Sequence, residues 1–202
     1  DLFFFHYIYV NQNKYRLTKG QNMKLTTKNY AIIAFCTAII AVLSQISIPV
    51  PVVPLTMQTL AIGLVATILP WRHSVTTTAL YIIIGAIGMP IYANFTGGFG
   101  ILFGPTGGFL LSFLIMAFVI SFYLSKFGHS KWHTIHANII GMLINLIIGT
   151  VWLKYYLKLN WSEAFVSGFV PFFIVGIIKA VFAASIGLTI RRRLLQAKLL
   201  SP

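Results

Sequence analysis

The sequence predicts an all-α integral membrane protein with six transmembrane helices. Apolar residues make up 58% of the 202 residues and charged residues only 8%, whereas soluble domains carry about 25% charged residues. The apolar residues gather in six long runs, and the charges lie mostly at the ends of these runs. A net charge of +13 therefore indicates contact with a lipid bilayer surface and no partnership with nucleic acid.

The first 22 residues differ from the rest of the chain. They open on Asp1 and contain the run LFFFHYIYV, which is too short to cross a bilayer and lacks the layout of a signal peptide. The first methionine is Met23, and we interpret it as the natural start. The sequence thus predicts an N-terminal extension without a function at residues 1–22 and one six-helix membrane domain at residues 23–202.

The six apolar runs are compared with the roughly 20 residues that a helix needs to cross a bilayer. The second and third runs are shorter, which requires flanking residues or local thinning of the bilayer. The expected segments are 30–48, 55–70, 74–89, 107–127, 135–157 and 168–190.

The basic residues predict the orientation in the membrane. Lys154 and Lys158 lie toward one side, and Lys179 lies within the membrane. The other twelve lie on the opposite side: Lys14, Arg16, Lys19, Lys24, Lys28, Arg72, Lys126, Lys131, Arg191, Arg192, Arg193 and Lys198. By the positive-inside rule, both the N and C termini are cytoplasmic, and the loops after the first and third segments face outward.

These two loops have an unusual composition. Residues 47–61 read SIPVPVVPLTMQTLA, and their prolines favour an extended, polyproline-like backbone. Residues 85–109 read GAIGMPIYANFTGGFGILFGPTGGF, and so many glycines allow tight turns and a close approach of the backbone to a ligand. Thr106 is the expected N-cap of the fourth helix, whose free N–H groups suit a carboxylate. The alternative is a glycine-rich loop that only packs between helices.

Lys179 lies near the middle of the last apolar run, where a charge is costly. The usual partner is an acid, yet the chain contains only Asp1 and Glu163. Glu163 precedes Lys179 by 16 residues, which is about 24 Å along a helix axis. The partner of Lys179 must therefore be neutral, or must arrive from outside as a ligand.

Four blocks carry a resemblance to a known family: IPVPVVPLTMQT, GAIGMPIYANFTGGFG, LFGPTGGFLLSF and PFFIVGIIKAV. They resemble the BioY family, the biotin-specific S components of energy-coupling factor (ECF) transporters, and the resemblance covers about residues 30–193. It implies a compact six-helix S-component fold in a prokaryotic plasma membrane, capture of biotin from outside the cell with high affinity, and no enzymatic activity or cofactor. A transmembrane scaffold (T) component and two ATPase subunits are the implied partners.

Two absences agree with this resemblance. The sequence contains no GxxxxGK[ST] phosphate loop, so any ATP must be used by another chain. A single cysteine, Cys36, excludes a multi-cysteine metal site, and no metal is expected.

The resemblance also implies site residues. Many relatives read Pro-Phe-x-Pro-Gly-Asp-x-x-Lys where this chain runs from Pro171 to Lys179, so the lysine is kept and the acid is replaced by Gly176. In the family pattern, the acid accepts from a ureido N–H of biotin and the lysine donates to the ureido carbonyl. Helical spacing places Phe172 and Phe182 as apolar walls beside the lysine. Further expected ligand contacts in the loop blocks are Gln58, Tyr92, Asn94, Thr106 and Gly107.

The missing acceptor has a candidate in Asn145. Together with Asn138, Gly141 and Gly149 it forms a stripe of small and polar residues on one face of the fifth segment, and we expect this face to pack inward. Asn145 and Lys179 lie at similar depth in their segments. Three roles therefore stay open for Asn145: accepting from the ligand, accepting from Lys179, or bonding to another helix.

The first segment offers a docking surface. Ala34 and Ala38 lie four residues apart, with Ala31 and Ala41 near the same stripe, and small residues at this spacing let another helix approach closely. The resemblance implies that this face meets the T component. The alternative is packing between helices of this chain.

Other functions give competing predictions. Lipoate is the main alternative ligand, because it has a similar carboxylate tail but no ureido group and does not need the missing acid. A channel or a structural membrane subunit is an alternative of a different class. A membrane hydrolase is disfavoured, because the chain lacks paired intramembrane acids and its five histidines lie in the tail or at cytoplasmic edges.

Overall fold

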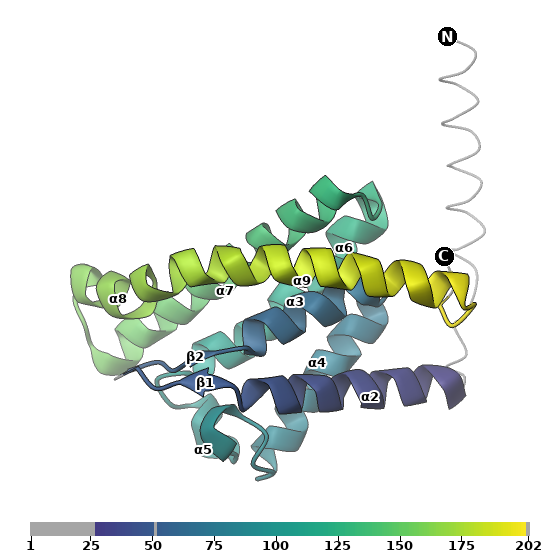
Figure 1. The fold of residues 1–202 in the computed structure, drawn as a ribbon. Coiled ribbons are helices and arrows are strands. Elements are labelled where there is room, and N and C mark those ends of the chain that lie inside the picture. The colour runs from purple at the N-terminus through teal and green to yellow at the C-terminus, as the bar shows by residue number, and fades with distance from the viewer. Residues whose placement is uncertain (1–26, 51, 201–202) are drawn as a thin grey trace. The chain divides into compact units, whose positions relative to one another are not determined.

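The computed structural model describes residues 27–50 and 52–200 (Figure 1). The chain divides into two compact units, residues 1–31 and 32–202. Within the first unit, residues 27–31 are described and form the beginning of a helix. The expected extension at residues 1–22, with the proposed start at Met23, lies outside the described residues.

Nearly all described elements are helices. In chain order they are α2 (Thr27–Ser44), β1 (Ser47–Ile48), β2 (Leu55–Thr56), α3 (Gln58–Ile68), α4 (Trp71–Ala86), the 3-10 helix η1 (Ala93–Phe95), α5 (Phe99–Leu102), α6 (Gly107–Phe127), α7 (Lys131–Leu157), α8 (Trp161–Gly168) and α9 (Val170–Gln196). Four described stretches are long and apolar enough to cross a membrane: α2, α6, α7 and the combined stretch Trp161–Gln196. The prediction of an all-helical membrane protein is confirmed.

The expected segments coincide with helices, but several boundaries differ. The fourth segment has the bounds of α6, and the third corresponds to α4. The first segment ends at Ser44, because Ser47 and Ile48 pair with Thr56 and Leu55 in a short antiparallel hairpin. Helix α8 precedes the sixth expected segment and shares only Gly168 with it. It begins with a capping box, in which the Asn160 side chain accepts from the Glu163 N–H and the Glu163 carboxylate accepts from the Asn160 N–H.

Helix α3 is short and almost entirely surrounded by protein. Its 11 residues extend about 16 Å, roughly half of the hydrocarbon core. It packs against α9, α6 and α7, and Ala61, Ile62 and Val65 are inaccessible to solvent or nearly so. The hairpin enters directly at its start (Figure 1). The beginning of α3 is therefore held by the surrounding helices, and it anchors the preceding loop beside a cavity.

Small residues bring α6 and α7 close together. Asn138, Gly141, Asn145 and Gly149 are all buried on one face of α7, which confirms the expected inward stripe. A Cβ on Gly141 would lie 2.5 Å from Ile120 Cγ1 of α6, well inside van der Waals contact. Only glycine permits this approach of the two backbones.

Candidate ligand-binding site

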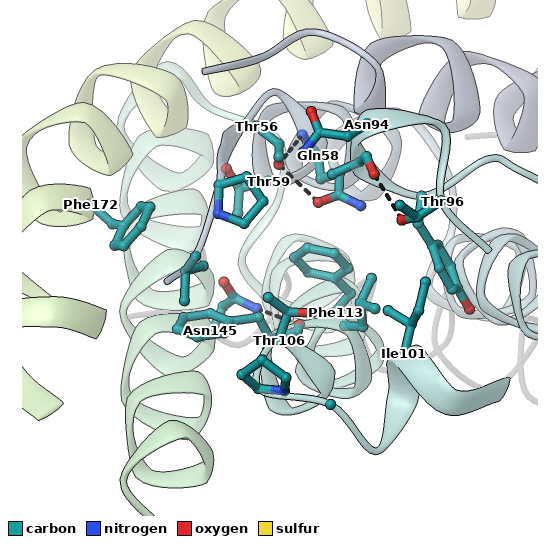
Figure 2. Close-up of a pocket in the computed structure, with 18 of the residues that line it drawn as sticks. Thr56, Gln58, Thr59, Asn94, Thr96, Ile101, Thr106, Phe113, Asn145 and Phe172 are labelled. Carbon is teal, nitrogen blue, oxygen red and sulfur yellow. Dashed lines mark hydrogen bonds between the residues drawn. The ribbon is translucent and has the colours of Figure 1, made fainter. Parts of the chain in front are cut away.

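A cavity of about 430 Å³ lies between the two loops and helices α6, α7 and α9 (Figure 2). The hairpin loop (residues 45–57) contributes Val53, Pro54 and Thr56, and the second loop (residues 87–98) contributes Tyr92 and Asn94. Figure 2 shows Thr56 and Asn94 of these loops on one side of the cavity and Asn145 and Thr106 on the other. The volume falls within the range of about 300–1,000 Å³ for small-molecule sites.

Seven of the eight expected ligand-contacting residues line this cavity. They come from separate parts of the chain and are Gln58, Tyr92, Asn94, Thr106, Asn145, Gly176 and Lys179. Gly107 is not among the lining residues, because it packs tightly against the backbone of Leu102 and leaves no space for a Cβ. The fold thus gathers residues that span more than half of the sequence, and their contact with a ligand stays a prediction.

Lys179 has a neutral partner, as expected from the scarcity of acids. Its side chain is 8% exposed, and Nζ donates to the backbone oxygen of Thr56 at 2.8 Å. An ammonium has three N–H donors, so two remain available at the cavity wall. Glu163 does not approach it and is used in the capping box of α8. The hairpin loop therefore orients the lysine through a backbone carbonyl.

The wall beside Lys179 differs in part from the expectation. Phe172 lines the cavity and contacts Phe109 with ring centroids 6.4 Å apart. Phe182 is 55% exposed and is not a lining residue, so its predicted role as a wall is wrong. At about 100° of rotation per residue, Phe182 and Gly176 diverge to opposite sides of Lys179, and the cavity lies on the Gly176 side.

Gly176 leaves room for a side chain of α7. A Cβ at this position would lie 2.9 Å from Met142 Sδ and 3.1 Å from Met142 Cγ. Met142 itself lines the cavity. The position that carries an acid in the family pattern is therefore covered here by the thioether of Met142, which supplies apolar surface in place of a charge.

Asn145 presents an acceptor to the cavity. Its side chain is 1% exposed, and Nδ2 donates to Phe109 O at 3.0 Å and to Ser112 Oγ at 2.7 Å, both on α6. This confirms the bond to another helix. Lys179 donates to Thr56 O, and the described residues show no hydrogen bond between Lys179 and Asn145. Both N–H groups are engaged, so Oδ1 is the group left to accept from a ligand.

The second loop is held by its own side chains. The Tyr92 hydroxyl donates to Ile82 O of α4 at 2.5 Å. Burial, and then the neighbouring Tyr81, raises the pKa of Tyr92 to about 12, so this hydroxyl stays a donor at neutral pH. Asn94 adopts φ 56°, a left-handed conformation that asparagine tolerates, and its Oδ1 accepts from Ser47 Oγ of the hairpin loop. The two loops are thus joined to each other beside the cavity.

The start of α6 borders the cavity, but Thr106 does not cap it as expected. Thr106 occupies the N-cap position with φ −91° and ψ −3°, and its side chain makes no capping hydrogen bond. This backbone is already helical, whereas a side-chain cap needs an extended one. Gly104, Pro105 and Thr106 still line the cavity, so the positive end of the helix dipole faces it.

The docking residues lie on the surface of α2. Ala34 and Ala38 are both exposed, whereas Ile33, Cys36 and Ile40 of the same helix are buried. Ala34 and Ala38 are therefore not buried by other described helices, whereas Ala41 of the same helix packs against the core.

The comparisons with known proteins identify the family. Residues 17–196 match the BioY family. The chain belongs to this family. It is 46% identical over 174 residues to the biotin transporter BioY2 of Lactococcus lactis subsp. cremoris, which covers 86% of this chain and 94% of that protein. It is 37% identical over 156 residues to the biotin transporter BioY of Thermotoga maritima, covering 77% and 91%.

A solved structure shares the fold. The crystal structure of the S-component for biotin from an ECF-type ABC transporter superposes with a TM-score of 0.79 at 22% identity, over 86% of this chain and 95% of that chain. The BioY match begins at residue 17, within the segment predicted to be an extension.

Proposed function

We propose that this protein captures biotin from outside the cell and mediates its uptake as the substrate-binding S component of an ECF-type ABC transporter. The observation that carries the proposal is the cavity, which combines a buried cation, a neutral acceptor and apolar walls. Biotin has the complementary chemistry, because its ureido head both donates and accepts hydrogen bonds and the rest of the molecule is mostly apolar. The relatives named for biotin support the same ligand.

In the proposed complex, Lys179 donates to the ureido carbonyl and Asn145 Oδ1 accepts from a ureido N–H. Lys179 is already fixed by Thr56 O, and Asn145 is fixed by α6, so neither group has to be ordered when the ligand binds. Phe109, Phe172 and Met142 enclose the apolar rings. The carboxylate tail lies toward the start of α6, where the helix dipole favours an anion.

We further infer six membrane crossings in a prokaryotic plasma membrane, with both termini in the cytoplasm. In this arrangement α2, α3, α4, α6, α7 and α9 cross, and the short α3 is completed by the hairpin loop. Irregular backbone at membrane depth is tolerated where it lines a cavity, and the hairpin loop contributes Val53, Pro54 and Thr56 to one. The cavity then opens to the outside.

The proposed partners are a T component and two ATPase subunits, with Ala34 and Ala38 as the docking face. Ala38→Leu should abolish energised biotin uptake in cells that supply the partners, because a bulky side chain prevents close helix contact. Biotin binding to the purified variant should stay at the wild-type level. Phe35→Leu, at an exposed position of the same helix, is the control. Loss of binding together with uptake would show that this face serves the fold.

Titration of the purified protein with biotin and with lipoate tests the ligand. Biotin should bind and raise the melting temperature in detergent, because a ligand that binds only the folded state stabilises it. Lipoate, which lacks the ureido group, should bind far more weakly. Tight binding of lipoate with weak binding of biotin would overturn the assignment.

Gly176→Asp separates the two ligands further. A carboxylate one turn before Lys179 could accept from a ureido N–H, so biotin affinity should be preserved or improved once Met142 shifts to admit the new Cβ. For a lipoate binder, the same carboxylate would face the dithiolane ring and pair with Lys179, and affinity should fall. Gly176→Ala is the matched control, because it requires the same shift of Met142 without adding a charge.

A further inference from the structure

We propose that Tyr81 is a positioning residue for the ligand site and acts through Gln58. Tyr81 lies on α4, is 0% exposed and does not line the cavity. Its hydroxyl accepts from Gln58 Nε2 at 2.6 Å and donates to Ile91 O of the second loop at 3.2 Å. The inference deepens the proposed function, because the ligand that Gln58 would meet is the one proposed above.

The direction of these hydrogen bonds is fixed by backbone groups. Ile91 O can only accept, so the Tyr81 hydroxyl must donate to it and the Tyr81 oxygen is left to accept from Gln58. The amide of Gln58 therefore turns Nε2 toward Tyr81 and Oε1 toward Thr56. At the other end, the Thr56 hydroxyl accepts from the Gln58 backbone N–H at 3.3 Å and donates to Gln58 Oε1 at 2.8 Å.

One amide orientation at the cavity follows from this relay. Gln58 keeps one N–H donor and one lone pair on Oε1 for a ligand, and their places are interchanged if the amide rotates by half a turn. Without the Tyr81 hydroxyl, only Thr56 would orient the amide, and a hydroxyl can either donate or accept. Both amide orientations would then be populated, and one of the two would present the wrong group to the ligand.

The relay also holds the second loop. Ile91 O accepts from Ser44 Oγ at 2.5 Å and from Gln45 Nε2 at 3.1 Å as well as from Tyr81. Gln45 Oε1 in turn accepts from the Phe95 N–H at 2.8 Å. Residues 91–96, which bring Tyr92 and Asn94 to the cavity, are thereby tied to α2 and to α4 at one carbonyl.

A double-mutant cycle in the full-length protein tests the proposal. Tyr81→Phe should weaken biotin binding about tenfold, the usual scale of one lost buried hydrogen bond. In a Gln58→Ala background it should cause no further weakening, which a general structural defect would not reproduce. Tyr123→Phe makes the same chemical change on α6, away from the cavity, and should leave affinity unchanged. Wild-type affinity in Tyr81→Phe, or additive effects in the cycle, would overturn the proposal.

Two further measurements extend the test. The first does not need the Tyr81→Phe protein, and the second does not need the ligand. If Tyr81→Phe does not fold, Gln58→Glu serves instead, because a carboxylate cannot donate to Tyr81; it should weaken binding, and unchanged affinity would overturn the relay. Amide hydrogen exchange without ligand should be faster at residues 91–96 in Tyr81→Phe than in the wild type, and an unchanged rate would also overturn it. Failure of the wild type to bind biotin would instead contradict the proposed function.

Discussion

Two buried asparagines on α7 have opposite surroundings. Asn138 and Asn145 lie seven residues apart, close to two helical turns, so they share one face. Their side chains are 0% and 1% exposed. Asn145 lines the cavity, whereas Asn138 does not. Sequence periodicity gives both residues the same position relative to the core, and only their neighbours separate a candidate ligand contact from a packing residue.

Their hydrogen bonds explain the difference. Asn145 donates both side-chain N–H groups to acceptors on α6, and its Oδ1 is left for the cavity. Asn138 Nδ2 donates to Thr67 Oγ1 of α3 at 2.8 Å and to Thr134 O of its own helix at 2.9 Å. Asn138 Oδ1 is buried without a hydrogen-bond partner and lies against Gly63 of α3. Gly63 packs directly against Asn138 and leaves no cavity there. Asn145, by contrast, faces the cavity.

Among substitutions at the cavity beside Asn145, Lys179→Ala should have the largest effect. Removing the charged donor should weaken biotin binding by about 1.5–3 kcal/mol, or about 10- to 150-fold, on the usual scale for a charged hydrogen bond. Titration calorimetry in detergent measures it. Lys154→Ala is the control, since that ammonium stacks over Tyr155 and Trp161 at 4.6 and 4.8 Å and lies outside the cavity. Tight biotin binding by the Lys179→Ala protein would mean that the lysine serves only the fold.

In the packed region around Asn138, Gly63→Ala should lower the free energy of unfolding by about 1–3 kcal/mol, the range for overpacking a core. A Cβ at this position would overlap Asn138 Oδ1 and lie 3.1 Å from Ala183 Cβ. The melting temperature should fall, while the fraction that remains folded binds biotin with wild-type affinity. Gly100→Ala, where a Cβ meets open space, should leave the melting temperature nearly unchanged. An equal loss of stability in both variants would contradict the claim that the region around Asn138 is tightly packed.

The smaller effects come from the asparagines themselves. Asn145→Ala should weaken biotin binding by about 1 kcal/mol, because it removes one neutral acceptor. Asn138→Ala should leave the affinity unchanged and lower stability by a similar amount. Measuring affinity and melting temperature for both variants separates the two roles, and equal affinities in the two variants would make Asn145 a packing residue as well.

Much of the helical framework could be predicted because periodicity and hydrophobic length report it directly. The α7 stripe and the neutral partner of Lys179 follow from spacing and from the shortage of acids. The identity of that partner could not be predicted, because the Thr56 carbonyl is a backbone group and leaves no trace in the side-chain pattern. The same holds for Ile91 O, which orients Tyr81.

Other differences between sequence and structure have an identifiable physical reason. Asn160 and Glu163 have the spacing of a capping box, which would have predicted the start of α8. Sequence distance from Lys179 predicts that Phe182 lies near the lysine, but it does not show on which side of the lysine the cavity lies. Thr106 had the residue type of an N-cap, but the tight turn before α6 gives it a helical backbone, and a side-chain cap is then geometrically excluded.

The central claim is that biotin binds in the cavity beside Asn145 and Lys179. A crystal or cryo-EM map of the protein at saturating biotin tests it most directly. We expect ligand density in the cavity, with the ureido carbonyl within hydrogen-bond distance of Lys179 Nζ and a ureido N–H facing Asn145 Oδ1. Density elsewhere, for instance in the groove lined by Ile147, Val151 and Tyr155 on α7, or an empty cavity at saturating biotin would contradict the claim.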